Sequence, residues 1–193
     1  MVQDAQGSDR GHRRRDYFTV ETLRNGVRVV VRALRPADRD ALLAAVRGMS
    51  DKSVYRRFFA FRREFSDSEV SRFVDVDFRD HVALVAVVDR GGEETIAAGA
   101  RYVTIAPGRA EVASAVTDEF QGQGLGKIMF RHLCTVAQQA GVSELVAEVL
   151  PDNLPMLKVF ERSGFPVVVK RSPDAVHVTI QVGRSGVCGP VSA

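Results

Sequence analysis

Residues 121–127 (QGQGLGK) carry residue types and a spacing that could bind phosphate. This segment lies between a strand-like apolar run ending at Thr117 and a helical run that begins at Ile128. Glycine at every second position lets main-chain N–H groups converge on one point without side chains in the way. The following helix directs its unpaired N–H groups and the positive end of its dipole at the same point. The residues predicted to bind a phosphate-rich ligand are Gln121, Gly122, Gln123, Gly124, Leu125, Gly126 and Lys127.

Two common nucleotide-binding motifs fit this segment poorly. A dinucleotide fingerprint needs its third glycine one residue after Gly126, and a P-loop needs glycine in place of Gln121 and Ser or Thr in place of Ile128. Lys127, in the first helical turn, opposes the helix dipole by roughly 0.3–1 kcal/mol, and a bound polyanion would reverse that sign. Arg131 follows one turn later on the same helix face. The alternative is that both are solvated basic residues on an amphipathic helix.

Glu111 is the acidic residue best placed for proton transfer. It lies on the strand that precedes the glycine segment, and strand alternation places it on one face with Ala113 and Ala115. We expect partial burial there, which would make Glu111 a better general base. Asp118 and Glu119 are rival bases, but they lie in the turn before the glycines, where acids are usually solvated. The alternative is that Glu111 is itself a solvated carboxylate after a turn.

The hydrophobic pattern predicts one mixed α/β domain. Strands are expected at residues 27–31, 81–89, 95–105, 110–117, 144–150, 167–170 and 176–182, and helices from Pro36, at 54–59, from the Ser66 capping box, at 128–140 and at 153–163. Turns at residues 90–92 and 107–108 would join the second, third and fourth strands into an antiparallel meander.

Read as Gln-x-x-Gly-x-Gly, the glycine segment resembles the signature of the GNAT superfamily of N-acetyltransferases, in which this loop binds the pyrophosphate of acetyl-CoA. The order of elements over residues 27–182 is similar to that superfamily. Residues 152–165 resemble its second motif, in which a helix-start asparagine, Asn153 here, contacts the pantetheine arm. The resemblance implies an α/β (α+β) acyl-CoA N-acyltransferase fold, with a mixed central sheet of about six to seven strands flanked by helices. The domain would span 17–182, between flexible arms at 1–16 and 183–193.

The same resemblance implies the site chemistry. Acetyl-CoA would be the co-substrate, without a metal, and would contact Ala115, Val116 and Thr117 as well as the glycine segment. Glu111 would be the general base, and the backbone N–H of Val116 would donate to the oxyanion, because the superfamily splays two strands there. Many members place a tyrosine general acid where this chain has Phe160, which cannot donate a proton. Because a CoA thiolate leaves readily, the acid is dispensable.

Residues 50–59 and 110–113 are similar to those of bacterial protein lysine acetyltransferases. This resemblance implies that the substrates are protein lysines, for example on acyl-CoA synthetases. Two alternatives stay open: an acetyltransferase for small amines, and a non-catalytic acyl-CoA sensor. The basic and aromatic run at 56–63 could line an acceptor groove, contact the CoA 3′-phosphate, or form an amphipathic helix with a solvated face.

Composition excludes several other classes of protein. A chain of 193 residues with a net charge of +3 is too weakly basic to indicate nucleic-acid binding. No apolar run approaches the roughly 18 residues that cross a membrane, and residues 1–20 have no secretory pattern. Cys134 and Cys188 are expected to be reduced thiols in a cytoplasmic protein. The histidines His81, His132 and His177 are expected to be structural or solvated, and the oligomeric state is open.

Overall fold

The computed structural model describes residues 14–62 and 64–183. The predicted arms therefore lie almost wholly outside the described residues, and the domain boundaries stay a prediction. The strands are β1 (Phe18–Thr22), β2 (Arg28–Ala33), β3 (His81–Asp89), β4 (Glu94–Ala106), β5 (Arg109–Val116), β6 (Glu144–Val149), β7 (Val167–Arg171) and β8 (Val176–Gln181). The helices are α2 (Arg39–Gly48), α3 (Asp51–Phe58), α4 (Asp67–Val74), α5 (Leu125–Gln139) and α6 (Leu154–Glu161), with short 3-10 turns η1 (Pro36–Asp38) and η2 (Asp118–Phe120).

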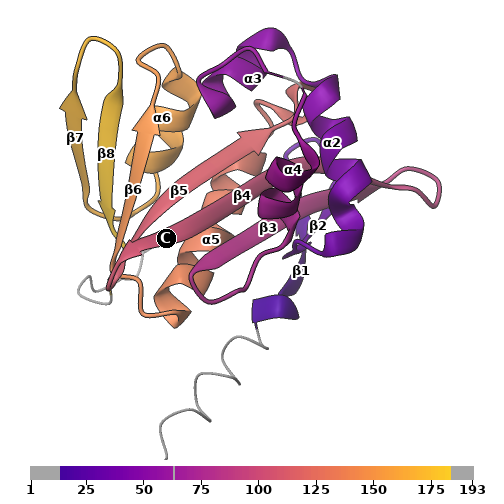
Figure 1. Ribbon diagram of the computed structural model, residues 1–193, viewed down its shortest axis with the longest axis horizontal. Helices are drawn as coiled ribbons and strands as arrows, with labels where there is room; N and C mark the ends of the chain where they lie inside the picture. Colours follow the sequence, from indigo (N-terminus) through magenta and orange to yellow (C-terminus); the bar gives the residue numbers. More distant parts are fainter. Residues whose placement is uncertain (1–13, 63, 184–193) are drawn as a thin grey trace, which may run out of the picture.

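All strands join one twisted sheet in the order β1-β2-β3-β4-β5-β6-β8-β7. Helix α5 covers one face of this sheet, and α2, α3 and α4 lie over the other face (Figure 1). Strand β3 is buried along almost its whole length, because helices cover it from both sides. The pairs β3–β4 and β4–β5 are antiparallel, as the predicted meander requires, and β5–β6 is parallel. The mixed α/β fold expected from the sequence is confirmed.

The sheet has eight strands, more than the six or seven expected, and the strand that the sequence pattern missed is β1. Its sequence FTVET is exposed or half-buried at every position, and it pairs only with β2. An edge strand of this kind lacks the strong apolar alternation from which the other strands were predicted. The Asn25-Gly26 turn therefore joins two strands instead of opening the first one.

The helix boundaries depend on local caps. Ser66 accepts from the Glu69 amide, and Glu69 accepts from the Ser66 amide, which is the predicted capping box at the start of α4. Cys134 is buried within α5, and burial raises the pKa of its thiol to about 12, so it is an unreactive core residue. Cys188 lies outside the described residues. None of the helices in the described ranges combines the length and apolar character needed to cross a membrane.

Candidate active site

Strands β5 and β6 separate after a short parallel contact. They pair only through Arg109 with Glu144, Ala110 with Leu145, and Glu111 with Val146. Strand β5 then continues to Val116 beside β4, while β6 pairs with β8 along its whole length. Because the ladder between them stops, the β5 edge beyond Glu111 presents main-chain groups that no strand satisfies. The split predicted from the resemblance is therefore a feature of this sheet, and a ligand could run along that edge.

The Val116 amide points into this opening. The Thr117 amide donates to the Ala97 carbonyl oxygen on β4, at 2.9 Å. Successive amides of a strand point in opposite directions, so the Val116 N–H faces away from β4 and toward the side from which β6 has departed. The Val116 carbonyl, on that same side, accepts from Gln121 Nε2 at 3.0 Å. One free amide beside the opening is what an oxyanion donor requires.

The glycine segment forms the start of α5. Gly124 is the residue before the helix, with φ 91°, and Gly122 has φ 74°, so both occupy the left-handed region that glycine favours. No side chain caps this helix, and its first turn contains no acid. The first three amides of α5, including that of Lys127, are left for an external acceptor, as at any helix start. The loop therefore has the backbone form of an anion site.

The two glutamines of the segment hold the loop in place. Gln121 Nε2 donates to Ser53 Oγ (3.0 Å) as well as to the Val116 carbonyl, and Gln123 Nε2 donates to the Glu119 carbonyl (2.7 Å). Both were predicted as coenzyme contacts, but in this structure their amide groups are engaged with the protein. Their observed contribution is to fix the segment around Gly122.

Arg24 lies beside this loop and was not identified from the sequence. Its Nε atom lies 3.6 Å from the point where a Cβ on Gly124 would be. It belongs to the turn between β1 and β2, about a hundred residues from the glycines, and no spacing in the sequence links the two. Gly126, on the other side, faces Val159 of α6 and Val116 of β5, at 3.5 and 3.8 Å from its own would-be Cβ. A Cβ at 126 would be in ordinary van der Waals contact with both, so the start of α5 packs closely between α6 and β5.

Asp118 joins the glycine loop to helix α3. Its two carboxylate oxygens accept from the Ser50 amide, the Ser50 hydroxyl and the Ser53 hydroxyl, each at 2.7 Å. Burial alone would raise the pKa of Asp118, but these hydrogen bonds outweigh it, and the net pKa is lowered. A carboxylate held in its charged form by three donors is a poor proton acceptor. Ser50 and Ser53, noted in the sequence only as part of a resemblance, act here as structural donors.

The remaining carboxylates are distinguished by their partners. Glu119 pairs with Arg90, whereas Glu111 has no hydrogen bond or ion pair within the part of the chain that the structure describes. The Glu111 side chain is exposed, so the partial burial expected for it is wrong. The strand alternation is right, but no element covers this end of β5. Glu111 is thus the acid left free at the opening, without the advantage of a dry site.

Two residues of the second motif serve the fold of α6. Asn153 caps this helix by accepting from the Met156 amide at 3.3 Å, which occupies the oxygen of its side chain and leaves its Nδ2 group. Phe160 is buried and packs edge-on against Phe130 of α5, with ring centroids 5.0 Å apart. Phe160 therefore packs in the core, which is the default role of a phenylalanine at this position. Arg56 of α3 bonds to the Asp152 carbonyl (2.6 Å) and carboxylate (3.0 Å), so α3 spans the opening toward the start of α6.

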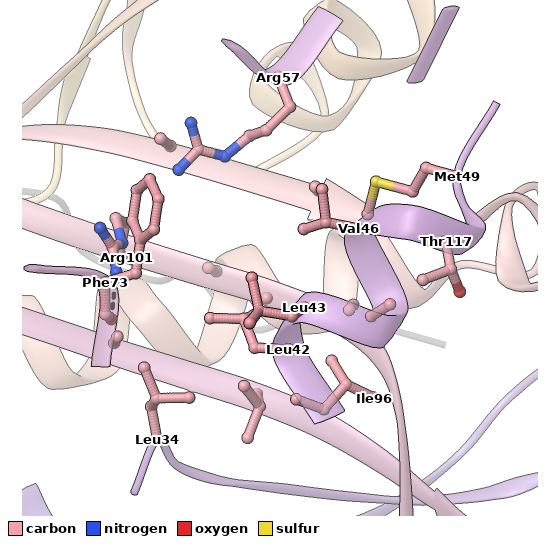
Figure 2. A pocket seen from close by; sticks show the side chains of 18 of the residues that line it. Leu34, Leu42, Leu43, Val46, Met49, Arg57, Phe73, Ile96, Arg101 and Thr117 are labelled. Atoms are coloured by element: carbon pink, nitrogen blue, oxygen red, sulfur yellow. Dashed lines mark hydrogen bonds between the residues drawn. The ribbon is translucent and has the colours of Figure 1, made fainter. Parts of the chain in front are cut away.

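An apolar pocket lies beside β5, on the face of the sheet that α2, α3 and α4 cover (Figure 2). It occupies about 770 Å³, counting the part open to solvent, between the α2, α3 and α4 region and strands β3, β4 and β5. Ala113, Ala115 and Thr117 contribute the β5 wall, on the face predicted from strand alternation. Two cations, Arg57 and Arg101, also line it. The sequence pointed to Arg57 only as part of the 56–63 run, and to Arg101 not at all.

The histidines lie outside the opening between β5 and β6. His132 is held between Tyr17 Oη (2.5 Å) and Glu21 Oε1 (2.8 Å), and His177 is exposed on β8. Burial, and then the charge of Arg101, lower the pKa of His81 to about 4. The structural and surface roles expected for His132 and His177 match these positions.

Comparisons with known proteins agree with this geometry. A family model described as an acetyltransferase (GNAT) domain matches residues 28–166. An acetyltransferase of Pseudomonas aeruginosa is 30% identical over 156 residues, which is 80% of this chain and 83% of that protein. Acetyltransferase Pat of Mycolicibacterium smegmatis is 32% identical over 74% of this chain, but the match spans only 42% of Pat.

Solved structures give the same result. The GNAT domain of S. lividans PAT superposes with a TM-score of 0.76 at 33% identity, covering 85% of this chain and 96% of that one. An acetyltransferase of Salmonella typhimurium, solved with its cofactor acetyl-CoA, shares the fold at 17% identity and a TM-score of 0.63, over 85% of this chain and 99% of that one. Together with the split sheet and the glycine-rich helix start, these matches show that the chain belongs to the GNAT family and is an acyltransferase of the acetyltransferase type.

Proposed function

We propose that this enzyme transfers the acetyl group of acetyl-CoA to lysine side chains of proteins, with Glu111 as general base and the Val116 N–H as oxyanion donor. The observation that carries this proposal is the separation of β5 from β6. It leaves the Val116 amide facing an opening that ends at the start of α5. Phosphate site, oxyanion donor and base then follow one another along one strand and the loop after it.

The coenzyme is proposed to lie with its diphosphate on the first amides of α5. Gly122 and Gly124 permit the close approach, Lys127 supplies charge, and Arg24 lies within reach of the same loop. The pantetheine arm would then run along the free edge of β5, past Thr117, Val116 and Ala115, and Asn153 would meet it with its free Nδ2 group. Acetyl-CoA as co-substrate is supported by the fold relative that was solved with it.

The reaction needs a proton acceptor, because at neutral pH only about one lysine amine in a thousand is uncharged. The amine nitrogen attacks the thioester carbonyl carbon, and the oxyanion accepts from the Val116 N–H. Glu111 takes the ammonium proton before the attack and passes it to solvent; the nitrogen loses a second proton to Glu111 after the attack, the C–S bond breaks, and the CoA thiolate leaves. Glu111 and Val116 are five residues apart, roughly 16 Å along a strand, so the proton travels through water. Phe160 supplies no proton, and the thiolate takes one from solvent or from Glu111.

The acceptor is proposed to be a protein because Glu111 is exposed and its surroundings on α3 are open. Tyr55 and Phe61 stack on each other at 4.6 Å between ring centroids while both remain exposed, with 36% and 74% of their surfaces accessible. Exposed aromatic surface on and just after the helix that contacts β5 suits contact with another protein. The similarity to acetyltransferase Pat and to S. lividans PAT supports the same assignment.

The test is incubation with radiolabelled acetyl-CoA, a panel of purified proteins including acyl-CoA synthetases, and a panel of free amines. Label is expected on protein lysines with the wild-type enzyme and is expected to be strongly reduced with Glu111→Gln. Label entering only free amines would contradict the protein-substrate assignment. Undiminished transfer by the variant would contradict the assigned base. Binding of acetyl-CoA without transfer to any acceptor would indicate a sensor.

A further inference from the structure

Two guanidinium groups enter the apolar pocket from different elements. Arg57 comes from α3 and Arg101 from β4, and both lie on the side of the pocket where Phe73 stands (Figure 2). Apart from Thr117, the other residues labelled there are apolar, with Leu42 and Met49 among them. Both arginines are half-buried, and two positive charges in so apolar a lining are unusual, because partly desolvated charges are normally paired.

Neither arginine has an acidic partner within the described residues. Arg101 donates to the Phe73 carbonyl oxygen at 2.6 Å, and its guanidinium carbon lies 5.0 Å from the Phe73 ring centre. The Arg57 guanidinium carbon lies 4.9 Å from the Phe58 ring centre, and the nearest opposing influence on it is Glu111, beyond ion-pair distance. Most of their N–H donors are therefore unused.

Arg32 shows how the same protein treats a buried guanidinium that has a structural role. It donates to both carboxylate oxygens of Asp38, at 2.7 and 2.8 Å, and also to Glu94 at 2.8 Å. These partners raise the pKa of Arg32, whereas burial lowers the pKa of Arg57, and burial together with the Arg57 charge lowers that of Arg101 to about 10. The pocket pair thus lacks the anion that the structural arginine has.

We propose that Arg57 and Arg101 form a carboxylate-binding site, so that the group which reacts beside β5 carries a carboxylate. Guanidinium groups match carboxylates in charge and in planar, two-point geometry. The aliphatic wall would hold the methylene chain that separates this carboxylate from the reacting atom. This inference rests on the acyl transfer and the thioester position of the proposed function, and it extends the substrates beyond acetyl and protein lysine to an acyl group or an acceptor that carries a carboxylate.

The position in the sheet separates this site from the coenzyme phosphates. Arg101 pairs with Ala113 across the β4–β5 ladder, whereas the glycine loop begins after Thr117. Four strand residues span about 13 Å, so Arg101 lies about that far along β5 from the loop, and Arg57 lies on the same side of the pocket as Arg101 (Figure 2). The carboxylate therefore belongs to the reacting end. It is carried either by a dicarboxylic acyl group on CoA or by an acceptor amine with a carboxylate of its own.

The first arm of the test measures binding of CoA, butyryl-CoA and succinyl-CoA by calorimetry. The two acyl groups each have four carbons and differ in whether the chain ends in methyl or carboxylate. The proteins compared are wild type, Arg57→Gln, Arg101→Gln, Arg101→Lys and the exposed α4 control Arg72→Gln. If the acyl group carries the carboxylate, wild type and the control bind succinyl-CoA at least about tenfold more tightly than butyryl-CoA. The two glutamine variants lose this preference but bind CoA itself like wild type, and Arg101→Lys retains part of the preference.

The second arm compares free lysine with lysinamide as acetyl acceptors, because these differ only in the carboxylate. If the acceptor carries it, kcat/KM is at least about tenfold higher for lysine, and Arg57→Gln and Arg101→Gln remove the difference. Unchanged CoA binding by each variant shows that it is folded. A preference in neither arm, or one that survives both glutamine variants, overturns the proposal. A parallel loss of CoA affinity assigns the arginines to the phosphates and overturns it too. A wild-type enzyme that binds no CoA contradicts the proposed function and removes this site with it.

Discussion

The two ends of the β5 edge are built in opposite ways. At the end near the glycine loop, Asp118, Gln121 and Gln123 are each hydrogen-bonded within the protein, and the first backbone amides of α5 are left for a ligand. At the end near Ala113, two arginines from separate elements share an apolar pocket without an acid between them. The loop is thus a rigid site for a fixed group, the coenzyme diphosphate. The pocket contains unpaired charge, which suits recognition of the group that varies between substrates.

The largest effect is expected from replacing the general base, and it distinguishes Glu111 from the carboxylates Asp118 and Glu119 at the loop end of β5. Glu111→Gln is expected to lower kcat by roughly 10²–10⁴-fold, because it removes general-base catalysis. Asp118→Asn and Glu119→Gln are expected to change kcat much less, since both carboxylates are already held by protein donors. Initial rates at saturating acetyl-CoA measure the difference. A loss at Asp118 or Glu119 equal to that at Glu111 would reassign the base.

The second prediction concerns the stability of the loop end. Asp118→Ala removes the acceptor of three hydrogen bonds from Ser50 and Ser53 and is expected to lower the free energy of unfolding by about 1–3 kcal/mol. Urea unfolding at pH 7 is the measurement. The matched control is Glu119→Ala, which removes only an exposed ion pair and is expected to cost less than about 1 kcal/mol. Equal costs would show that the Asp118 network does not hold the loop.

A third prediction concerns the pKa of His81, which burial and then the charge of Arg101 lower at the pocket end. Its pKa is about 4 in the folded protein against an ordinary 6.5, so between these values the unfolded chain binds more protons. Stability is therefore lost as pH falls from about 6.5 toward 4. Wild type is expected to lose about 1–2 kcal/mol more than His81→Gln between pH 7 and pH 5. The control His177→Gln, at an exposed site, should follow wild type. A His81→Gln curve parallel to wild type would contradict the depressed pKa.

The smallest expected effect is on the free energy of unfolding at the pocket end, where the substitution should stabilise the protein or leave its stability unchanged. Arg57→Met removes a charge that lacks an acidic partner in the described part of the chain, and relieves its repulsion of Arg101. The free energy of unfolding is expected to stay unchanged or to rise, by up to about 1 kcal/mol. Thermal unfolding monitored by circular dichroism measures it. A marked destabilisation would mean that Arg57 is structural and would weaken the contrast with Asp118.

The sequence predicts the parts of the structure whose signals lie in consecutive residues, and it misses those that depend on tertiary contacts. The loop, helix α5 and the meander were predicted within one to three residues at most boundaries, because turn residues, glycines and apolar periods occur in consecutive residues. Strand β1 was missed, because an edge strand has no strong pattern. Arg24, Arg57 and Arg101 reach their positions only through tertiary packing, and no spacing links them to the glycines or to Ala113.

The prediction that Glu111 is partly buried was wrong for a related reason. Alternation along β5 predicts which face Glu111 occupies, but whether a helix covers that face depends on where α3 ends. Asn153 and Phe160 show the reverse case. Their motif positions were predicted correctly, while their observed contacts, a helix cap and a core packing pair, are those of the fold.

The central claim is that backbone amides after β5 bind acetyl-CoA and that Glu111 acts only in the chemistry. Calorimetric titration of acetyl-CoA into wild type, Gly124→Val and Glu111→Gln tests it directly. Gly141→Val serves as the control, because Gly141 has a similar positive φ, 83° against 91° at Gly124, and lies just after the opposite end of α5. Valine at 124 strains the loop, so the Kd is expected to rise roughly 100-fold, while Glu111→Gln and Gly141→Val bind like wild type. Wild-type affinity in Gly124→Val would contradict the account.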